Sequence, residues 1–200
     1  MSVFCLLWIP LFYFFRRSIV SRCNGGYVPA LLLGCAIAAY QHFVGPLLPP
    51  GGFGFSRWIN GFLDIISFPI ILSFGACFLL SKFRLLPEHI DYANFSLVCL
   101  IPLSLYRAIV LISVRYPESL VAVTLLWTAL CVGIPFLAGF AKHPRRSFAV
   151  FAVLGAFALP FVAATSWWAF FSQQTFLGFA LFAVSLAPAV VSVVSDFCKK

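Results

Sequence analysis

The feature that most constrains this chain is a series of apolar stretches, each about as long as a membrane's hydrocarbon layer is thick. A helix needs roughly 20 residues to cross about 30 Å of hydrocarbon at about 1.5 Å per residue. Six stretches of this length are bounded by charged residues, Pro or Gly. They are Val28 to Leu48, Trp58 to Leu80, Tyr92 to Val114, Leu120 to Phe140, Phe148 to Phe171 and Phe176 to Val194.

The composition excludes an ordinary water-soluble domain. Hydrophobic residues make up 63% of the chain and charged residues only 9%, whereas a soluble domain has roughly 25% charged residues. A small soluble sphere cannot hide so much apolar surface, because its exposed shell is a large fraction of the molecule. We therefore predict an all-α fold, a polytopic transmembrane helix bundle in which residues 1–200 form a single integral membrane domain.

A further apolar stretch, Val3 to Phe15, is shorter than the others. A secretory signal carries its positive charges before the apolar part, whereas Arg16 and Arg17 follow this one. We expect a retained first helix, which either extends through Val20 with its arginines reaching the interface or lies partly in the interface. The prediction is seven spans, with six as the alternative.

The basic residues predict the orientation. The formal charge is +8, and most Lys and Arg residues fall in alternate connections between the apolar stretches. By the positive-inside rule this bias places the N-terminus outside and the C-terminus in the cytoplasm. No nucleic-acid partner is expected. The basic residues on the predicted cytoplasmic side are Arg16, Arg17, Arg22, Lys82, Arg84, Lys142, Arg145, Arg146, Lys199 and Lys200, against Arg57 and Arg115 outside.

Every predicted span contains a proline or ends at one. A proline inside a helix removes one backbone hydrogen bond, which suggests kinked helices around a cavity. The alternative is that Pro is simply commoner in membrane helices than in soluble ones. The prolines concerned are Pro10, Pro46, Pro69, Pro102, Pro135, Pro160 and Pro188.

Asp64 and Arg107 are the charges that fall inside predicted spans, where charge is costly. Counting from the predicted outer boundary, Asp64 lies about 9 Å deep and Arg107 about 12 Å deep. Because their spans are consecutive and antiparallel, we predict a salt bridge or a shared water network. Helical spacing places Asn60, Asp64 and Ser67 on one face, and Ser104 with Arg107 on another, so both faces should point into the bundle.

These residues suggest a polar pocket that opens to the outside. Arg107 could meet an anionic group of a solute, while two tryptophans cover its apolar body. The alternative is one buried ion pair that holds two helices in register, with the aromatic residues forming the usual interfacial belt. The substrate-binding candidates are Gln41, His42, Asn60, Asp64, Arg107, Trp167 and Trp168.

The sequence offers little for catalysis, a metal or a cofactor. If the chain is an enzyme, His42 and Asp64 would carry protons and Arg107 would stabilise a phosphate or carboxylate. His89 and His143 are expected on the opposite side of the membrane, and the cysteines form no CxxC pair. We therefore assign no catalytic residue, metal site or cofactor, and expect a protein that is not an enzyme.

The favoured function is transport, either by a transporter or by a membrane-embedded substrate-binding subunit, for a small amphipathic or anionic solute. One alternative is a non-catalytic structural subunit of a larger membrane protein complex, and another is a membrane enzyme acting on a lipid or lipid-linked substrate. The expected partners are membrane lipids, a small-molecule solute, and partner membrane or cytoplasmic subunits. The expected location is the bacterial inner (plasma) membrane.

Overall fold

The computed structural model describes residues 27–47, 54–86, 91–111 and 117–198, and these ranges are 91% helical with no strand. The all-α class is therefore confirmed for this part of the chain. The helices are α2 (Val28–Phe43), α3 (Phe55–Asn60), α4 (Ser67–Lys82), α5 (Tyr92–Leu111), α6 (Pro117–Gly139), α7 (Arg146–Phe171) and α8 (Thr175–Cys198). Short 3-10 turns, η1 (Gly45–Leu47) and η3 (Phe140–Lys142), follow α2 and α6, and a π-helical segment, η2 (Gly61–Ile66), joins α3 to α4.

Six helices in the described ranges are long and apolar enough to cross a membrane, and each overlaps one predicted stretch. By length and composition they indicate a multi-pass membrane protein. The segment from Val3 to Phe15 lies outside the described residues, so a seventh span stays a prediction, as does the orientation of the termini. The candidate spans are Val28–Leu47, Phe55–Lys82, Tyr92–Ile109, Leu120–Lys142, Arg146–Phe171 and Thr175–Ser195.

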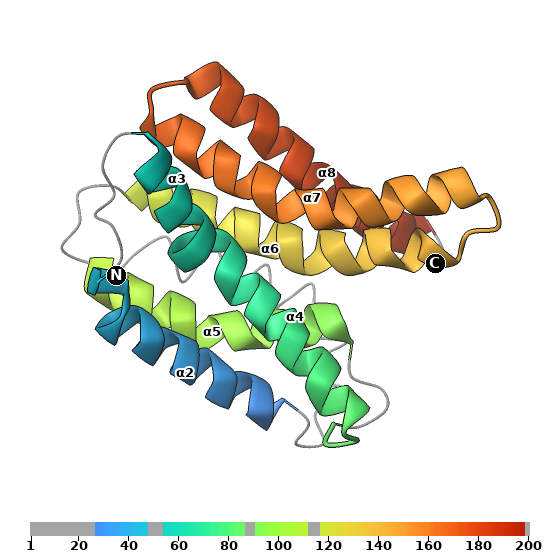
Figure 1. The fold of residues 1–200 in the computed structure, drawn as a ribbon, viewed down its shortest axis with the longest axis horizontal. Coiled ribbons are helices and arrows are strands. Elements are labelled where there is room, and N and C mark those ends of the chain that lie inside the picture. The colour runs from blue at the N-terminus through green and yellow to red at the C-terminus, as the bar shows by residue number, and fades with distance from the viewer. Residues whose placement is uncertain (1–26, 48–53, 87–90, 112–116, 199–200) are drawn as a thin grey trace.

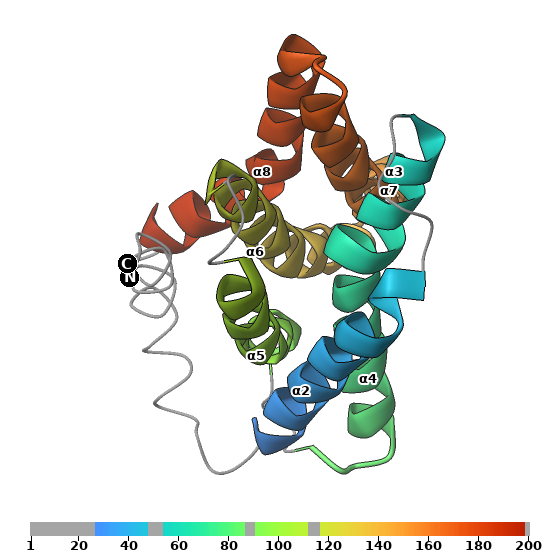
Figure 2. The ribbon, with the colours of Figure 1, turned by 90° about the vertical axis from the view of Figure 1, so that its left-hand side faces the viewer.

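The spans run alternately in opposite directions, as the colour sequence of Figure 1 shows. Helix α2 packs along α5, and α8 packs against α6 and α7. The continuous span of α3, η2 and α4 lies between these two groups and contacts both (Figure 2). This span is therefore the junction between the two groups of helices, and η2 lies within it.

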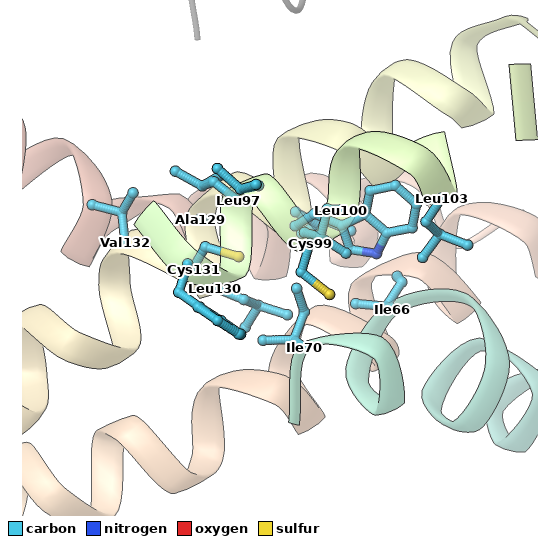
Figure 3. Close-up of a cluster of buried hydrophobic side chains, with 14 of the residues drawn as sticks. Ile66, Ile70, Leu97, Cys99, Leu100, Leu103, Ala129, Leu130, Cys131 and Val132 are labelled. Carbon is cyan, nitrogen blue, oxygen red and sulfur yellow. The ribbon is translucent and has the colours of Figure 1, made fainter. Parts of the chain in front are cut away.

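Helices α5 and α6 form the centre of the bundle, since 56% of an apolar 18-residue stretch of each is buried, compared with 17% of such a stretch of α8. Figure 3 shows their side chains packed against those of η2 and α4. Cys99 and Cys131 are fully buried and unbonded to each other, and they pack as small apolar side chains. The other labelled members of this core are Ile66, Ile70, Leu97, Leu100, Leu103, Ala129, Leu130 and Val132.

Helices α2 and α5 approach closely at Gly34. A Cβ atom added to Gly34 would lie 2.0 Å from the carbonyl oxygen of Cys99 and 3.0 Å from Cδ of Pro102. Small residues let the backbones of two membrane helices come this close. Such packing holds the helices together, because in lipid no hydrophobic driving force brings apolar side chains together. Gly34 thus fixes the distance between the two helices that carry Gln41 and Arg107.

Prolines lie inside four of the described helices. Whether these helices are kinked at their prolines stays a prediction. Pro69 differs from these, because it is the third residue of α4 and lies three residues after the end of the π-helical segment. The prolines within helices are Pro102 in α5, Pro135 in α6, Pro160 in α7 and Pro188 in α8.

Candidate functional site

The α3–η2–α4 span loses one helical donor at Pro69, which follows the carbonyl of Ile65 by four residues and that of Asp64 by five. In η2 the backbone spacing widens, and the N–H of Ser67 donates to the carbonyl of Phe62, five residues earlier. Pro69 has no N–H, so it cannot donate to the carbonyl of Ile65 at α-helical spacing or to that of Asp64 at π-helical spacing. Within a membrane such carbonyls need another donor, because lipid supplies none.

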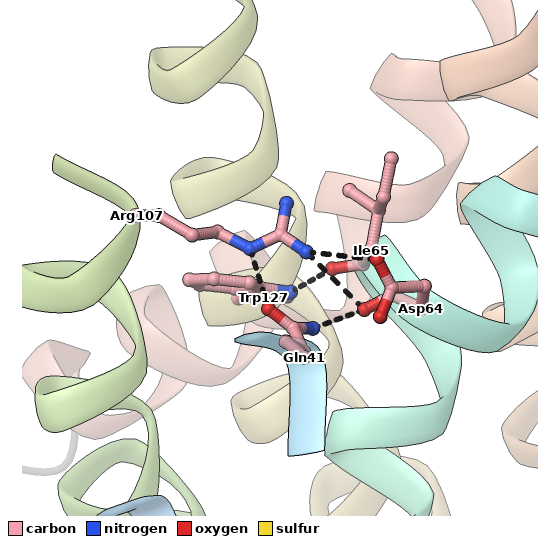
Figure 4. Close-up of polar contacts among 5 residues, drawn as sticks. All are labelled: Gln41, Asp64, Ile65, Arg107 and Trp127. Atoms are coloured by element: carbon pink, nitrogen blue, oxygen red, sulfur yellow. Dashed lines mark hydrogen bonds and ion pairs between the residues drawn. The ribbon is translucent and has the colours of Figure 1, made fainter. Parts of the chain in front are cut away.

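Side chains from three neighbouring helices supply these donors, as Figure 4 shows. Nε1 of Trp127 in α6 donates to the carbonyl of Ile65 at 2.9 Å. Nη2 of Arg107 in α5 donates to the carbonyl of Asp64 at 3.3 Å. Nε2 of Gln41 in α2 donates to the same carbonyl. The interrupted span is therefore bound to α2, α5 and α6 through its own backbone.

The predicted salt bridge between Asp64 and Arg107 is confirmed. Nη2 of Arg107 lies 3.7 Å from Oδ2 of Asp64, and each side chain is 14% exposed. Nε of Arg107 donates to Oε1 of Gln41 at 3.0 Å, and the guanidinium carbon lies 5.7 Å from the ring centroid of Trp127. A direct charge-assisted hydrogen bond would be about 2.7 to 2.9 Å long, so the two charges attract each other without tight contact.

The cluster of Gln41, Asp64, Arg107 and Trp127 leaves polar atoms unused. Oδ1 of Asp64 is buried and has no hydrogen-bond partner. Among the residues that the structure describes, Nη1 of Arg107 has none either, and Figure 4 draws no contact to it. A Cβ atom added to Gly45 would lie 3.6 Å from both carboxylate oxygens of Asp64, so only a glycine hydrogen covers that side. One acceptor and one donor edge thus remain for a ligand or water.

His42 does not join this cluster directly. Its Nδ1 lies 3.1 Å from the hydroxyl oxygen of Tyr106, and the imidazole is exposed. The structure therefore pairs His42 with Tyr106 rather than with Asp64 or Arg107. An acid–base role for His42 beside Asp64 has no support from this geometry.

The two tryptophans of α7 contact α3 and η2. Trp167 is buried, and a Cβ atom added to Gly61 would lie 2.6 Å from its Cδ1. Nε1 of Trp168 donates to the carbonyl of Gly54 at 2.9 Å. Both side chains therefore hold α7 against the α3–η2 segment, and a role in covering a solute stays a prediction.

The face predicted for Asn60, Asp64 and Ser67 divides at the π-helical segment. Ser67 is buried as expected, but its hydroxyl donates to the carbonyl of Pro160 in α7 at 2.9 Å, whereas Asp64 points to α2 and α5. Spacing of i, i+4 and i+7 holds for a regular α-helix, and η2 lies within this stretch. Asn60 is half-buried at the end of α3.

Sequence reasoning missed Trp127. Counted from Leu120, this residue lies about 10 Å deep, which is the depth of both buried charges and is too deep for an interfacial aromatic belt. A buried indole N–H usually finds an acceptor, and Pro69 predicts carbonyls that need donors. These two signals together could have identified the contact.

Within the described ranges, no three His, Cys, Asp or Glu residues gather in a way that could hold a metal ion. The cluster itself presents a guanidinium, a carboxyl group, an amide and an indole. Comparisons with models of protein families, with curated proteins and with solved structures find no match to this chain.

Proposed function

We propose that this protein is a transporter or a membrane-embedded substrate-binding subunit for a small amphipathic solute with an anionic group. One observation carries the proposal: Arg107 is held inside the bundle with one edge of its guanidinium unbound, beside a carboxylate with an unpartnered oxygen. A pair that only joined two helices would need neither feature.

The fixed position of Arg107 suits anion binding. Gln41, the Asp64 carbonyl and the Trp127 ring restrain the guanidinium on three sides, so its free edge is oriented in advance. Such an edge pairs well with the planar oxygens of a carboxylate, phosphate or sulfonate, and it does so more strongly where water is scarce. The surrounding apolar side chains would contact the rest of the solute.

The position of the cluster supports access from outside. Gln41 lies in the last turn of α2, and Asp64 lies in the first half of its span. The bundle has one end at which α2, α5 and α7 finish and an opposite end at which α7 begins. The cluster lies nearer the first of these ends. Basic residues of the described ranges gather at the opposite end, which the positive-inside rule assigns to the cytoplasm. These residues are Lys82, Arg84, Lys142, Arg145 and Arg146.

A second candidate is a structural subunit of a larger membrane complex. The observation in its favour is the small buried share of the outer helices, 17% of an apolar 18-residue stretch of α8 and 22% of such a stretch of α2. Large apolar side chains are exposed along α7 and α8, and lipid or a partner subunit would cover them. They include Phe151, Phe157, Phe176 and Phe179.

Both candidates can be tested by purifying the protein from its native membrane and identifying bound molecules by mass spectrometry. The test variant is Arg107→Gln with Asp64→Asn, which removes both charges and leaves no lone buried ion. A carrier or binding subunit should retain an anionic amphipathic molecule that the double variant loses. A stoichiometric partner protein, retained by both forms with no small molecule, would favour the structural subunit.

A matched control is Lys82→Gln with Asp91→Asn. It removes the same two kinds of charge from exposed positions at the other end of the bundle. Asn at position 91 can still accept the hydrogen bond from the N–H of Ala93, so the start of α5 keeps its cap. This control should retain whatever the unmodified protein retains.

A further inference from the structure

We propose that the Asp64–Arg107 site takes up its anion together with one proton, and that the carboxyl group of Asp64 receives this proton. The inference rests on the proposed function and adds the coupling ion. Two observations support the uptake of a proton: the balance of charges in the cluster, and the unpartnered oxygen of Asp64.

The charge balance comes first. The described cluster holds one positive group, Arg107, and one negative group, Asp64, while Gln41 and Trp127 are neutral. An anion bound to Arg107 would leave the site with one net negative charge. An unbalanced charge inside the apolar part of a membrane is strongly disfavoured. A bound anion therefore needs a cation or a proton to accompany it.

The geometry favours the proton over a metal ion. A sodium-type ion would need several oxygen ligands, and interrupted membrane helices usually offer their open carbonyls for this purpose. Here the carbonyls of Asp64 and Ile65 already accept hydrogen bonds from Gln41, Arg107 and Trp127. Arg107 also stands 3.7 Å from the carboxylate and would repel a metal cation.

Asp64 is suited to hold the proton once the anion arrives. Its Oδ2 is only loosely paired with Nη2 of Arg107, which also bonds the Asp64 carbonyl at 3.3 Å. An incoming anion can replace the carboxylate as the partner of Arg107. A hydronium ion of the outer water then transfers its proton to the displaced carboxylate: one O–H bond of the hydronium breaks, one O–H bond of the carboxyl group forms, and a neutral water molecule leaves. The neutral carboxyl group gains a donor, so that it can pair with a ligand oxygen.

Other titratable groups lie on the elements packed around Asp64. Helix α2 carries His42 and α5 carries Tyr106, and these two contact each other at 3.1 Å. Helix α3 carries Arg57, which donates to the carbonyl of Phe171 at 3.0 Å. The side chains that α6 and α7 bring to η2, Trp127 and Trp167, do not titrate. His42 is the imidazole among these groups, so the experiment must separate its protons from those of Asp64.

The experiment is calorimetric titration of the purified protein with benzenesulfonate. This probe stays anionic across the working pH range, so any proton taken up on binding belongs to the protein. Repeating the titration in buffers with different ionisation enthalpies counts the protons. We expect about one proton per sulfonate, and an affinity that falls about tenfold for each pH unit of increase where free Asp64 is ionised and bound Asp64 is protonated.

Three variants assign the proton. Asp64→Asn should bind the sulfonate with no proton uptake and with an affinity independent of pH. His42→Gln should keep the proton count and pH dependence of the unmodified protein. Asp91→Asn should keep them too, because Asp91 is an exposed carboxylate at the other end of the bundle. If Asp64→Asn does not fold, the proton count of His42→Gln still decides whether protons other than those of His42 are taken up, and Asp64→Glu should retain the uptake.

The outcomes separate this inference from the function beneath it. Sulfonate binding without proton uptake, or uptake that persists in folded Asp64→Asn, would overturn the coupling to a proton and leave an anion-binding protein. Failure of the unmodified protein to bind the sulfonate at any pH would overturn both.

Discussion

Arg107 has two roles, one electrostatic and one as a hydrogen-bond donor, and its Nη2 takes part in both. Its charge faces Asp64 at 3.7 Å, and its N–H groups bond Gln41 and the backbone of Asp64. The first role follows from the sequence, because two opposite charges at one depth are costly apart. The second does not, because the hydrogen bonds to the carbonyl of Asp64 form within a π-helical segment that no pattern in the sequence predicts.

The charge role predicts unequal effects of single and double substitution. Arg107→Gln should destabilise the fold by about 3 kcal/mol, because it leaves Asp64 as a lone, mostly buried charge. Arg107→Gln combined with Asp64→Asn should recover most of that loss, since the remaining amides can still hydrogen bond. Thermal unfolding in detergent, followed by circular dichroism, measures both. Equal destabilisation in the two variants would mean that the hydrogen bonds of Arg107, and not its charge, stabilise the junction.

At the scale of the helices, Pro69 and η2 explain why a tryptophan is needed deep in α6. Trp127→Phe leaves the carbonyl of Ile65 without its donor and should cost about 2 kcal/mol. Pro69→Ala returns an N–H that can reach this carbonyl, so Trp127→Phe should cost clearly less in that background. A double-mutant cycle on unfolding measures the difference.

The control for this cycle is Trp168→Phe. It also removes an indole hydrogen bond, but to the carbonyl of Gly54, which Pro69 does not affect. Its cost should be the same with Pro69 or Ala at position 69. Additive costs for Trp127→Phe and Pro69→Ala would remove Pro69 as the reason for the open carbonyl.

The contact between α2 and α5 gives a second prediction at this scale. Gly34→Ala should destabilise the fold by about 3 kcal/mol, because its Cβ would meet a backbone oxygen that cannot move aside as a side chain would. Gly75→Ala is the matched control in α4, where nothing lies within 4 Å of an added Cβ. The control should be neutral or stabilising by up to about 1 kcal/mol, since Ala is the better helix former. Similar melting temperatures for the two variants would contradict a close approach at Gly34.

For the whole molecule, lipid explains what the sequence could predict. A membrane span must be long, apolar and internally hydrogen bonded, so six helices and their approximate limits follow from hydropathy alone. Which helices become neighbours does not follow from hydropathy, because all sides of such a helix are apolar and either lipid or another helix can cover each of them. This is why Asp64 and Arg107, which need each other, could be paired, while Trp167 against Gly61 and His42 against Tyr106 could not.

The orientation in the membrane is the prediction on which the direction of the proposed uptake depends. Gln173 and His143 are exposed and lie in connections at opposite ends of α7. In a background whose native cysteines are replaced by Ala or Ser, Gln173→Cys should react with a membrane-impermeant maleimide on intact cells. His143→Cys should react only after the cells are permeabilised, because it lies in the basic connection that the positive-inside rule keeps in the cytoplasm. The reverse pattern would turn the cluster toward the cytoplasm, and any solute bound at Arg107 would then be one that the cell exports or holds inside.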